Sequence, residues 1–273
     1  MARTQPVVMS TPPPPFGSSA PQKPGWPFKP IDLMNRVVPE GRAAIGGLAI
    51  WFFIWPFVIL LSGDIAGLLT LAIGEVSAAL GEDDISEQSY LRSLYLLLVV
   101  TDLALLWIFA GWLQRRGLTA AVLDVRPGRF GLETGYAGVF LILTVVFAVA
   151  ATDWLTTYTP LPDMTNELPV PGDDPSAIWY MIPAIVLLGP YIEEVVFRGW
   201  LLPALVKRMG GWVLPILISS LMFGALHVFV GVPVVIYTAV LGICAGLARR
   251  VTGRLWAPVL LHVANNLIAT VEM

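Results

Sequence analysis

Long apolar segments alternate with short polar ones along most of this 273-residue chain. A helix that spans a membrane needs about 20 predominantly apolar residues. Seven segments approach or exceed that length, at roughly 43–62, 91–113, 136–153, 177–197, 212–230, 232–248 and 255–271. The pattern therefore predicts an all-α fold, a polytopic membrane helix bundle of about seven transmembrane helices.

Two further segments differ from these spans. Residues 65–80 are apolar but short, and they contain Glu75, so we expect an interfacial or membrane-surface helix there. Residues 1–30 contain nine prolines, and such a composition cannot bury enough apolar surface to become ordered. We predict a disordered Pro-rich cytoplasmic tail over residues 1–35 and one transmembrane helical domain over residues 36–273.

Composition agrees with a membrane protein, and the charges give it an orientation. The chain is 56% hydrophobic and only 13% charged, which is unusual for a soluble domain of this length. Basic residues gather before the first span and after the second, fourth and sixth: Arg3, Lys23, Lys29, Arg36, Arg42, Arg115, Arg116, Arg126, Arg129, Lys207, Arg208, Arg249, Arg250 and Arg254. The loops between these basic regions are acidic. The positive-inside rule then predicts a cytoplasmic N-terminus and an external C-terminus.

A carboxylate pair and an arginine interrupt the fourth apolar segment. Ionisable side chains at membrane depth are costly, so they indicate a functional site. Glu194 and Arg198 are four residues apart, in the Glu-before-Arg order that favours an ion pair on one helix face. Glu193 lies about 100° around the helix and remains available as a general base. Pro190, just before the pair, suggests that this span is kinked or broken there.

The only two histidines of the chain also lie in apolar segments. Phe223 precedes His227 by one helical turn, and Asn266 follows His262 by one turn. An imidazole and a carboxamide on one face could donate hydrogen bonds to a developing oxyanion. They could equally bridge neighbouring helices by hydrogen bonds, and the residues alone leave both interpretations open.

The predicted helix boundaries do not bring both histidines to one depth. At about 1.5 Å per residue, Glu193 and His262 lie at the same level. The same count leaves His227 about 12 Å too far toward the outer surface. Either the fifth span is tilted or starts deeper, or the boundaries near Gly210 and Gly211 are wrong.

Three motifs therefore follow one another along the chain, in the order EExxxR, FxxxH and HxxxN. Their residues are Glu193, Glu194, Arg198, Phe223, His227, His262 and Asn266. This set resembles the CAAX-protease/bacteriocin-processing (CPBP, Abi) family of intramembrane proteases, without a substitution in any motif. The resemblance covers roughly residues 177–270 and implies a protease core there. The implied activity is hydrolysis of a peptide bond in a membrane-associated or lipid-modified protein or peptide.

The resemblance also implies residue roles. Glu193 and His227 would activate water, while His262 and Asn266 would stabilise the oxyanion. Glu194, Arg198 and Phe223 would support them. Family members have also been described as metalloproteases, and Glu193, His227 and His262 could hold a divalent ion such as zinc. A catalytic zinc would consume all three, and the chain lacks HExxH, so we favour a site without a cofactor.

Two non-enzymatic functions use the same buried polar residues. One is a proton-coupled transporter, although the internal repeats common in transporters are not found in this sequence. The other is an immunity or scaffold membrane protein without catalysis. For the enzyme we expect a membrane-embedded or lipidated substrate in the lipid bilayer, no nucleic-acid partner, and the cell membrane of a bacterium as its location.

Overall fold

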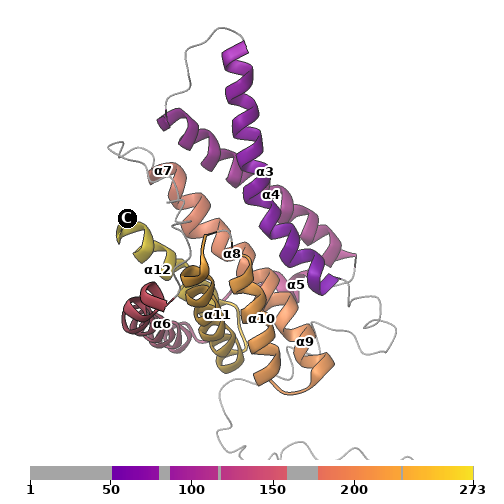
Figure 1. Cartoon of the computed structure of the whole chain (residues 1–273). Coiled ribbons are helices and arrows are strands. Elements are labelled where there is room, and N and C mark those ends of the chain that lie inside the picture. Colours follow the sequence, from indigo (N-terminus) through magenta and orange to yellow (C-terminus); the bar gives the residue numbers. More distant parts are fainter. Residues whose placement is uncertain (1–50, 80–86, 116–117, 159–177, 229, 273) are drawn as a thin grey trace, which may run out of the picture.

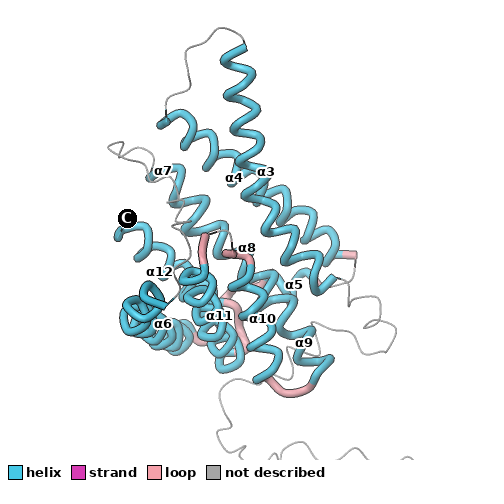
Figure 2. The backbone as a smooth tube through the Cα atoms, in the orientation of Figure 1, coloured by secondary structure: helices cyan, strands magenta, loops and turns pink. Residues whose placement is uncertain are grey.

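The computed structural model describes residues 51–79, 87–115, 118–158, 178–228 and 230–272. In these ranges the only regular secondary structure is helical (Figure 2), which confirms the predicted all-α fold. Within the same ranges, four helical stretches are long and apolar enough to cross a membrane: Ser89–Gln114, Phe130–Ala151, Trp179–Met209 and Val232–Thr252. The protein is thus a multi-pass membrane protein, although the predicted count of seven spans is not reached by this measure. The predicted disordered tail lies outside the described residues.

Helices α3 (Trp51–Ala79) and α4 (Glu87–Gln114) pack against each other along one side of the molecule (Figure 1). The structure corrects the prediction of a separate surface helix at 65–80, because α3 continues without a break through that segment. Polar and glycine positions near Gly63 do not end the helix. In an apolar environment, each backbone N–H and C=O group needs a partner within the helix.

The fourth predicted span begins as expected but continues to Met209 instead of ending near residue 197. Its five consecutive segments are α7 (Ile178–Met181), η2 (Ile182–Leu188), α8 (Gly189–Glu194), η3 (Val195–Leu201) and α9 (Leu202–Met209). The two η segments are π-helical, with five-residue hydrogen-bonded turns. We call this run of segments the motif helix.

Prolines account for most of the register changes in the motif helix. The segments η2, α8 and α9 each begin one residue before a proline, namely Pro183, Pro190 and Pro203. Proline has no N–H to donate to the preceding turn, so the hydrogen-bond pattern has to change near it. The predicted kink or break at Pro190 is therefore a change of register within a continuous helix.

Three helices complete the C-terminal part: α10 (Val213–Ala225), α11 (Val232–Thr252) and α12 (Trp256–Glu272). Helix α11 packs against α10, α12 and α6 (Phe130–Tyr158), which lies on the opposite side of the molecule from α3 (Figure 1). Close contact between α10 and α11 requires Gly224, because a Cβ atom there would lie 2.6 Å from the carbonyl oxygen of Val235.

The observed helix boundaries remove the predicted difference in depth between His227 and Glu193. Because the motif helix continues to Met209, the turn at Gly210 and Gly211 lies about 24 Å along the helix from Glu193. Helix α10 then rises about 20 Å in the opposite direction. His227, two residues beyond the end of α10, therefore returns to the level of Glu193. The fifth predicted span, 212–230, was too long at its C-terminal end.

Candidate functional site

Three parts of the C-terminal region contribute the predicted site residues. Glu193, Glu194 and Arg198 lie on the motif helix. Phe223 lies on α10, and His227 lies in the turn that follows it. His262 and Asn266 lie on α12, which packs against both η2 and α8.

The predicted ion pair between Glu194 and Arg198 is present. Arg198 Nη1 donates to Glu194 Oε1 at 2.9 Å, and neither side chain has any exposed surface. Arg198 Nη2 donates to the carbonyl oxygen of Gly242 on α11 at 3.0 Å. A Cβ atom at position 242 would lie 3.1 Å from that nitrogen, so glycine permits this approach. The guanidinium therefore ties the motif helix to α11 inside the protein.

His262 lies between the two carboxylates. Its Nδ1 is 3.0 Å from Glu194 Oε1, and because a carboxylate only accepts, Nδ1 donates the proton. Its Nε2 lies 3.9 Å from Glu193 Oε2, too far for a direct hydrogen bond. That oxygen of Glu193 is buried and has no hydrogen-bond partner. One water molecule could bridge such a separation.

The ring of Phe223 joins both histidines. The rings of His227 and His262 each lie 5.5 Å from the Phe223 ring, both in edge-on geometry. The guanidinium carbon of Arg198 lies 4.6 Å from the centre of the same ring, a cation–π contact. The structure therefore brings all three motifs together around one phenyl ring.

His227 approaches this cluster from the end of α10. Its Nδ1 donates to the carbonyl oxygen of Phe223 at 3.2 Å, which leaves Nε2 of the neutral ring as a hydrogen-bond acceptor. Among the described residues, no hydrogen bond or ion pair joins His227 to Glu193. The structure thus brings His262, and not His227, into the nearest contact with the carboxylates.

Arg249, a buried side chain near the site, was not predicted from the sequence to be a site residue. Its Nε donates to the carbonyl oxygen of Arg198 at 3.1 Å. That carbonyl lacks a donor on its own helix, because the N–H of Leu202 bonds to Phe197 and the next residue is Pro203. Pro203, which has no N–H to offer the carbonyl of Arg198 five residues earlier, was the available signal in the sequence. Arg249 thus secures the backbone of the segment that carries Arg198.

The predicted metal ligands do not form a metal site as they are arranged. In the ranges that the structure describes, no three His, Cys, Asp or Glu side chains are grouped closely enough to hold an ion. The Nδ1 atoms of His227 and His262 each donate to an oxygen of the protein. Each ring therefore presents its Nε2 atom for other contacts.

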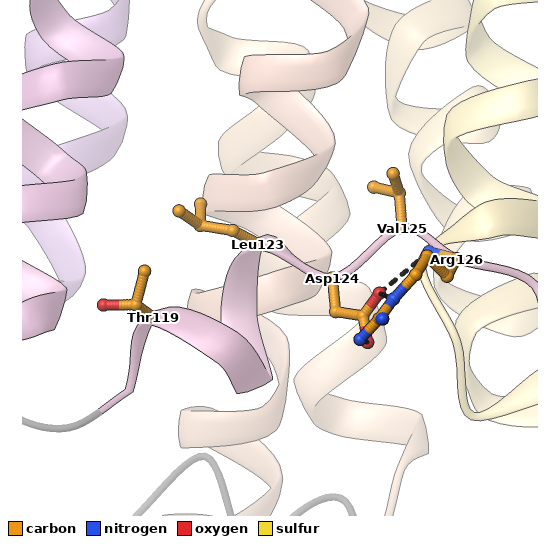
Figure 3. Close-up of a pocket in the computed structure, with 5 residues that line it drawn as sticks. All are labelled: Thr119, Leu123, Asp124, Val125 and Arg126. Carbon is orange, nitrogen blue, oxygen red and sulfur yellow. Dashed lines mark hydrogen bonds and ion pairs between the residues drawn. The ribbon is translucent and has the colours of Figure 1, made fainter.

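The segment between α4 and α6 packs against the motif helix. It contains α5 (Thr119–Leu123) and an extended stretch, and Thr119, Leu123, Asp124, Val125 and Arg126 line a pocket (Figure 3). Arg126 Nε donates to Asp124 Oδ1 at 2.9 Å. This hydrogen bond lowers the pKa of Asp124 to about 2. Since the Arg126 side chain is 85% exposed, the pair is a surface feature and not part of the buried cluster.

One family model matches the chain. Residues 175–268 match the model described as "Type II CAAX prenyl endopeptidase Rce1-like". The matched range contains all the residues of the three motifs and nearly coincides with the predicted core at 177–270. No curated protein and no solved structure matches the chain.

Proposed function

We propose that this protein, whose residues 175–268 match the Rce1-like CAAX prenyl endopeptidase model, hydrolyses peptide bonds by general-base activation of water at Glu193. The observation that supports this mechanism is the environment of that side chain. Its Oε2 is buried and without a partner, 3.9 Å from Nε2 of His262. At the neighbouring Glu194, Oε1 accepts from both Arg198 and His262, and Oε2 is buried without a hydrogen-bond partner. Among the described residues, Glu193 is thus the carboxylate of this pair without an arginine partner.

The chemistry begins with a water molecule beside Glu193. The carboxylate takes a proton from the water while the oxygen forms a bond to the carbonyl carbon of the scissile peptide. The carbonyl oxygen becomes an oxyanion. When the C–N bond breaks, the proton on Glu193 passes to the leaving nitrogen. The products are a new carboxyl group and a new amine, and Glu193 returns to its carboxylate form.

The other site residues have complementary roles in this proposal. His227 accepts a hydrogen bond from the attacking water at Nε2, since its Nδ1–H is directed to the Phe223 carbonyl. Asn266 and His262 donate to the oxyanion. For His262 this role requires a proton on Nε2, because Nδ1 donates to Glu194. The Glu194–Arg198 pair keeps the His262 ring in place.

We further propose that this route does not require a tightly bound metal. Elemental analysis of active, detergent-purified protein should find no stoichiometric zinc, and activity should persist after treatment with a chelator. Stoichiometric metal, together with activity that a chelator removes and added metal restores, would contradict this part of the proposal.

The substrate is a membrane-embedded or lipid-modified protein or peptide, since the cluster lies among membrane-spanning helices. We propose that the basic helix ends, near Arg115 and Arg250, face the cytoplasm. We also propose that the protein lies in the cell membrane of a bacterium. Cysteines placed at these two positions in a Cys244→Ala background should not react with an impermeant thiol reagent added outside. Labelling from outside would reverse the orientation.

The proposed function is tested by cleavage of a pool of candidate membrane proteins. Purified wild type and Glu193→Gln are incubated with the pool, and new peptide termini are identified by mass spectrometry. The amide keeps the size of the side chain but cannot accept the proton. Termini should appear with the wild type and be absent with the variant, while the two proteins melt at the same temperature. Equal cleavage by both proteins would exclude Glu193 as the base.

A further inference from the structure

A chain of side-chain hydrogen bonds leads to Asn266 from helix α11. The hydroxyl of Tyr237 on α11 donates to Oδ1 of Asn265. Nδ2 of Asn265 donates to Oδ1 of Asn266 at 3.3 Å. Nδ2 of Asn266 in turn donates to the carbonyl oxygen of Ile185 at 3.0 Å. These contacts connect α11, α12 and the motif helix, which lie side by side (Figure 1).

The Ile185 carbonyl needs a donor from outside its own helix. In an α-helix it would accept from Gly189, but the N–H of Gly189 bonds to Ala184 instead. In a π-helix it would accept from residue 190, which is a proline without an N–H. An unsatisfied carbonyl at membrane depth is costly. Asn266 therefore has a fixed acceptor on the helix that carries Glu193.

The two hydrogen bonds of Asn266 determine the orientation of its carboxamide. A primary amide has one acceptor oxygen and two N–H donors. Asn265 engages the oxygen and Ile185 engages one N–H, so exchanging the oxygen and nitrogen would break both bonds. The second N–H then points in one direction only. A preorganised donor of this kind contributes more to stabilising an oxyanion than one that must first be oriented.

We propose that Tyr237 and Asn265 are positioning residues, which hold the second N–H of Asn266 toward the oxyanion. This inference rests on the proposed function and extends it to Tyr237, outside the three motifs, and to Asn265, at an unspecified position of HxxxN. Tyr237 acts at a distance: its hydroxyl pairs with the Asn265 amide, while the Ile185 carbonyl, which only accepts, sets the direction of the hydrogen bonds through Asn266 and Asn265. The hydrogen bonds form one directed relay, from a phenol to the oxyanion donor.

The test is a double-mutant cycle in the full-length protein. Tyr237→Phe, Asn266→Ala and the double variant are assayed on a peptide substrate identified by wild-type cleavage. Tyr237→Phe should lower kcat about tenfold, with KM changed less than about twofold. In the Asn266→Ala background the same change should alter kcat less than about twofold, because the relay has no donor left to position. Tyr136→Phe, on α6, is the matched control and should match wild type.

The outcomes separate this inference from the proposed function. If wild type and Glu193→Gln give the same products, the proposed function is wrong and the relay has no reaction to serve. If those two differ but Tyr237→Phe has the kcat of wild type, only the relay is wrong. An equal loss of kcat in both backgrounds, or a loss matched by a lower melting temperature, would assign Tyr237 a purely structural role.

Discussion

The motif helix and its neighbours differ from the N-terminal helices in how much of their surface the protein itself covers. In the most apolar part of Trp179–Met209, 50% of the residues are buried, and the share is 44% for Val232–Thr252. For Ser89–Gln114 and Phe130–Ala151 the shares are only 17% and 11%. All four are apolar enough to span a membrane. Hydropathy therefore does not distinguish a helix surrounded by protein from one surrounded by lipid.

The polar side chains show what that difference means. Glu194, Arg198 and His262 are buried where helices surround them, and Glu194 accepts hydrogen bonds from both Arg198 and His262. The N-terminal helices instead expose large apolar side chains such as Trp107 and Val149, which are 79% and 75% exposed. Lipid chains can cover such surfaces but cannot satisfy a charge. The surrounding helices of the C-terminal region thus allow the buried ionic cluster of Glu194, Arg198 and His262.

The largest effect on stability is expected from removing the guanidinium of that cluster. Arg198→Ala leaves Glu194 buried without its cation, a change that costs about 3–5 kcal/mol. We expect little folded protein after extraction, measured by yield and by melting temperature in detergent. Arg126→Ala is the matched control, because that guanidinium is exposed, and its yield should equal wild type. A folded Arg198→Ala protein with wild-type stability would contradict the importance of the ion pair.

A pair of glycine substitutions compares the two regions by packing alone. At Gly224 on α10 an added Cβ would lie 2.6 Å from the Val235 carbonyl oxygen, so Gly224→Ala should destabilise the protein by about 1–3 kcal/mol. At Gly138 on α6 an added Cβ would meet nothing within 4 Å. Gly138→Ala should leave the melting temperature unchanged or raise it slightly. Equal shifts in melting temperature for the two variants would contradict the proposed difference in packing between the regions.

The smallest effect on stability is expected at the exposed ion pair between Asp124 and Arg126, beside α5. The pKa of Asp124 is lowered to about 2 in the folded protein by its hydrogen bond with Arg126, from about 3.9 when unfolded. Its stabilising contribution is present above pH 4 and is lost as the pH falls through 2. Asp124→Asn should lower the melting temperature slightly at pH 7, and the difference should shrink at pH 3. A difference that grows on acidification would contradict this account.

Some contacts of this site could be predicted from sequence spacing, and others could not. The Glu194–Arg198 pair is local, four residues apart, and helix geometry predicted it. The bond between Glu194 and His262 joins residues 68 positions apart, and no periodicity indicates it. The motifs predicted that these residues belong to one site, but not which histidine lies nearer to the carboxylates.

The helix boundaries were predicted less well for a physical reason. Polar residues and prolines end helices in water, where solvent satisfies the freed backbone groups. Inside a membrane protein, α3 continues past Gly63 and the motif helix continues past Pro190. Side chains from other helices satisfy the carbonyls that proline leaves without a donor, as Asn266 does for Ile185. Those partners are distant in sequence, so the continuation was not visible.

The most direct test of water activation by Glu193 is cleavage in water enriched with oxygen-18. Wild type should release fragment pairs that meet at one peptide bond, with one heavy oxygen in the new carboxyl group. Glu75→Gln changes an exposed carboxylate on α3 and should give the same labelled fragments, while Glu193→Gln should give none. Labelled fragments from Glu193→Gln at the wild-type rate, or no labelled fragments from wild type, would contradict the account.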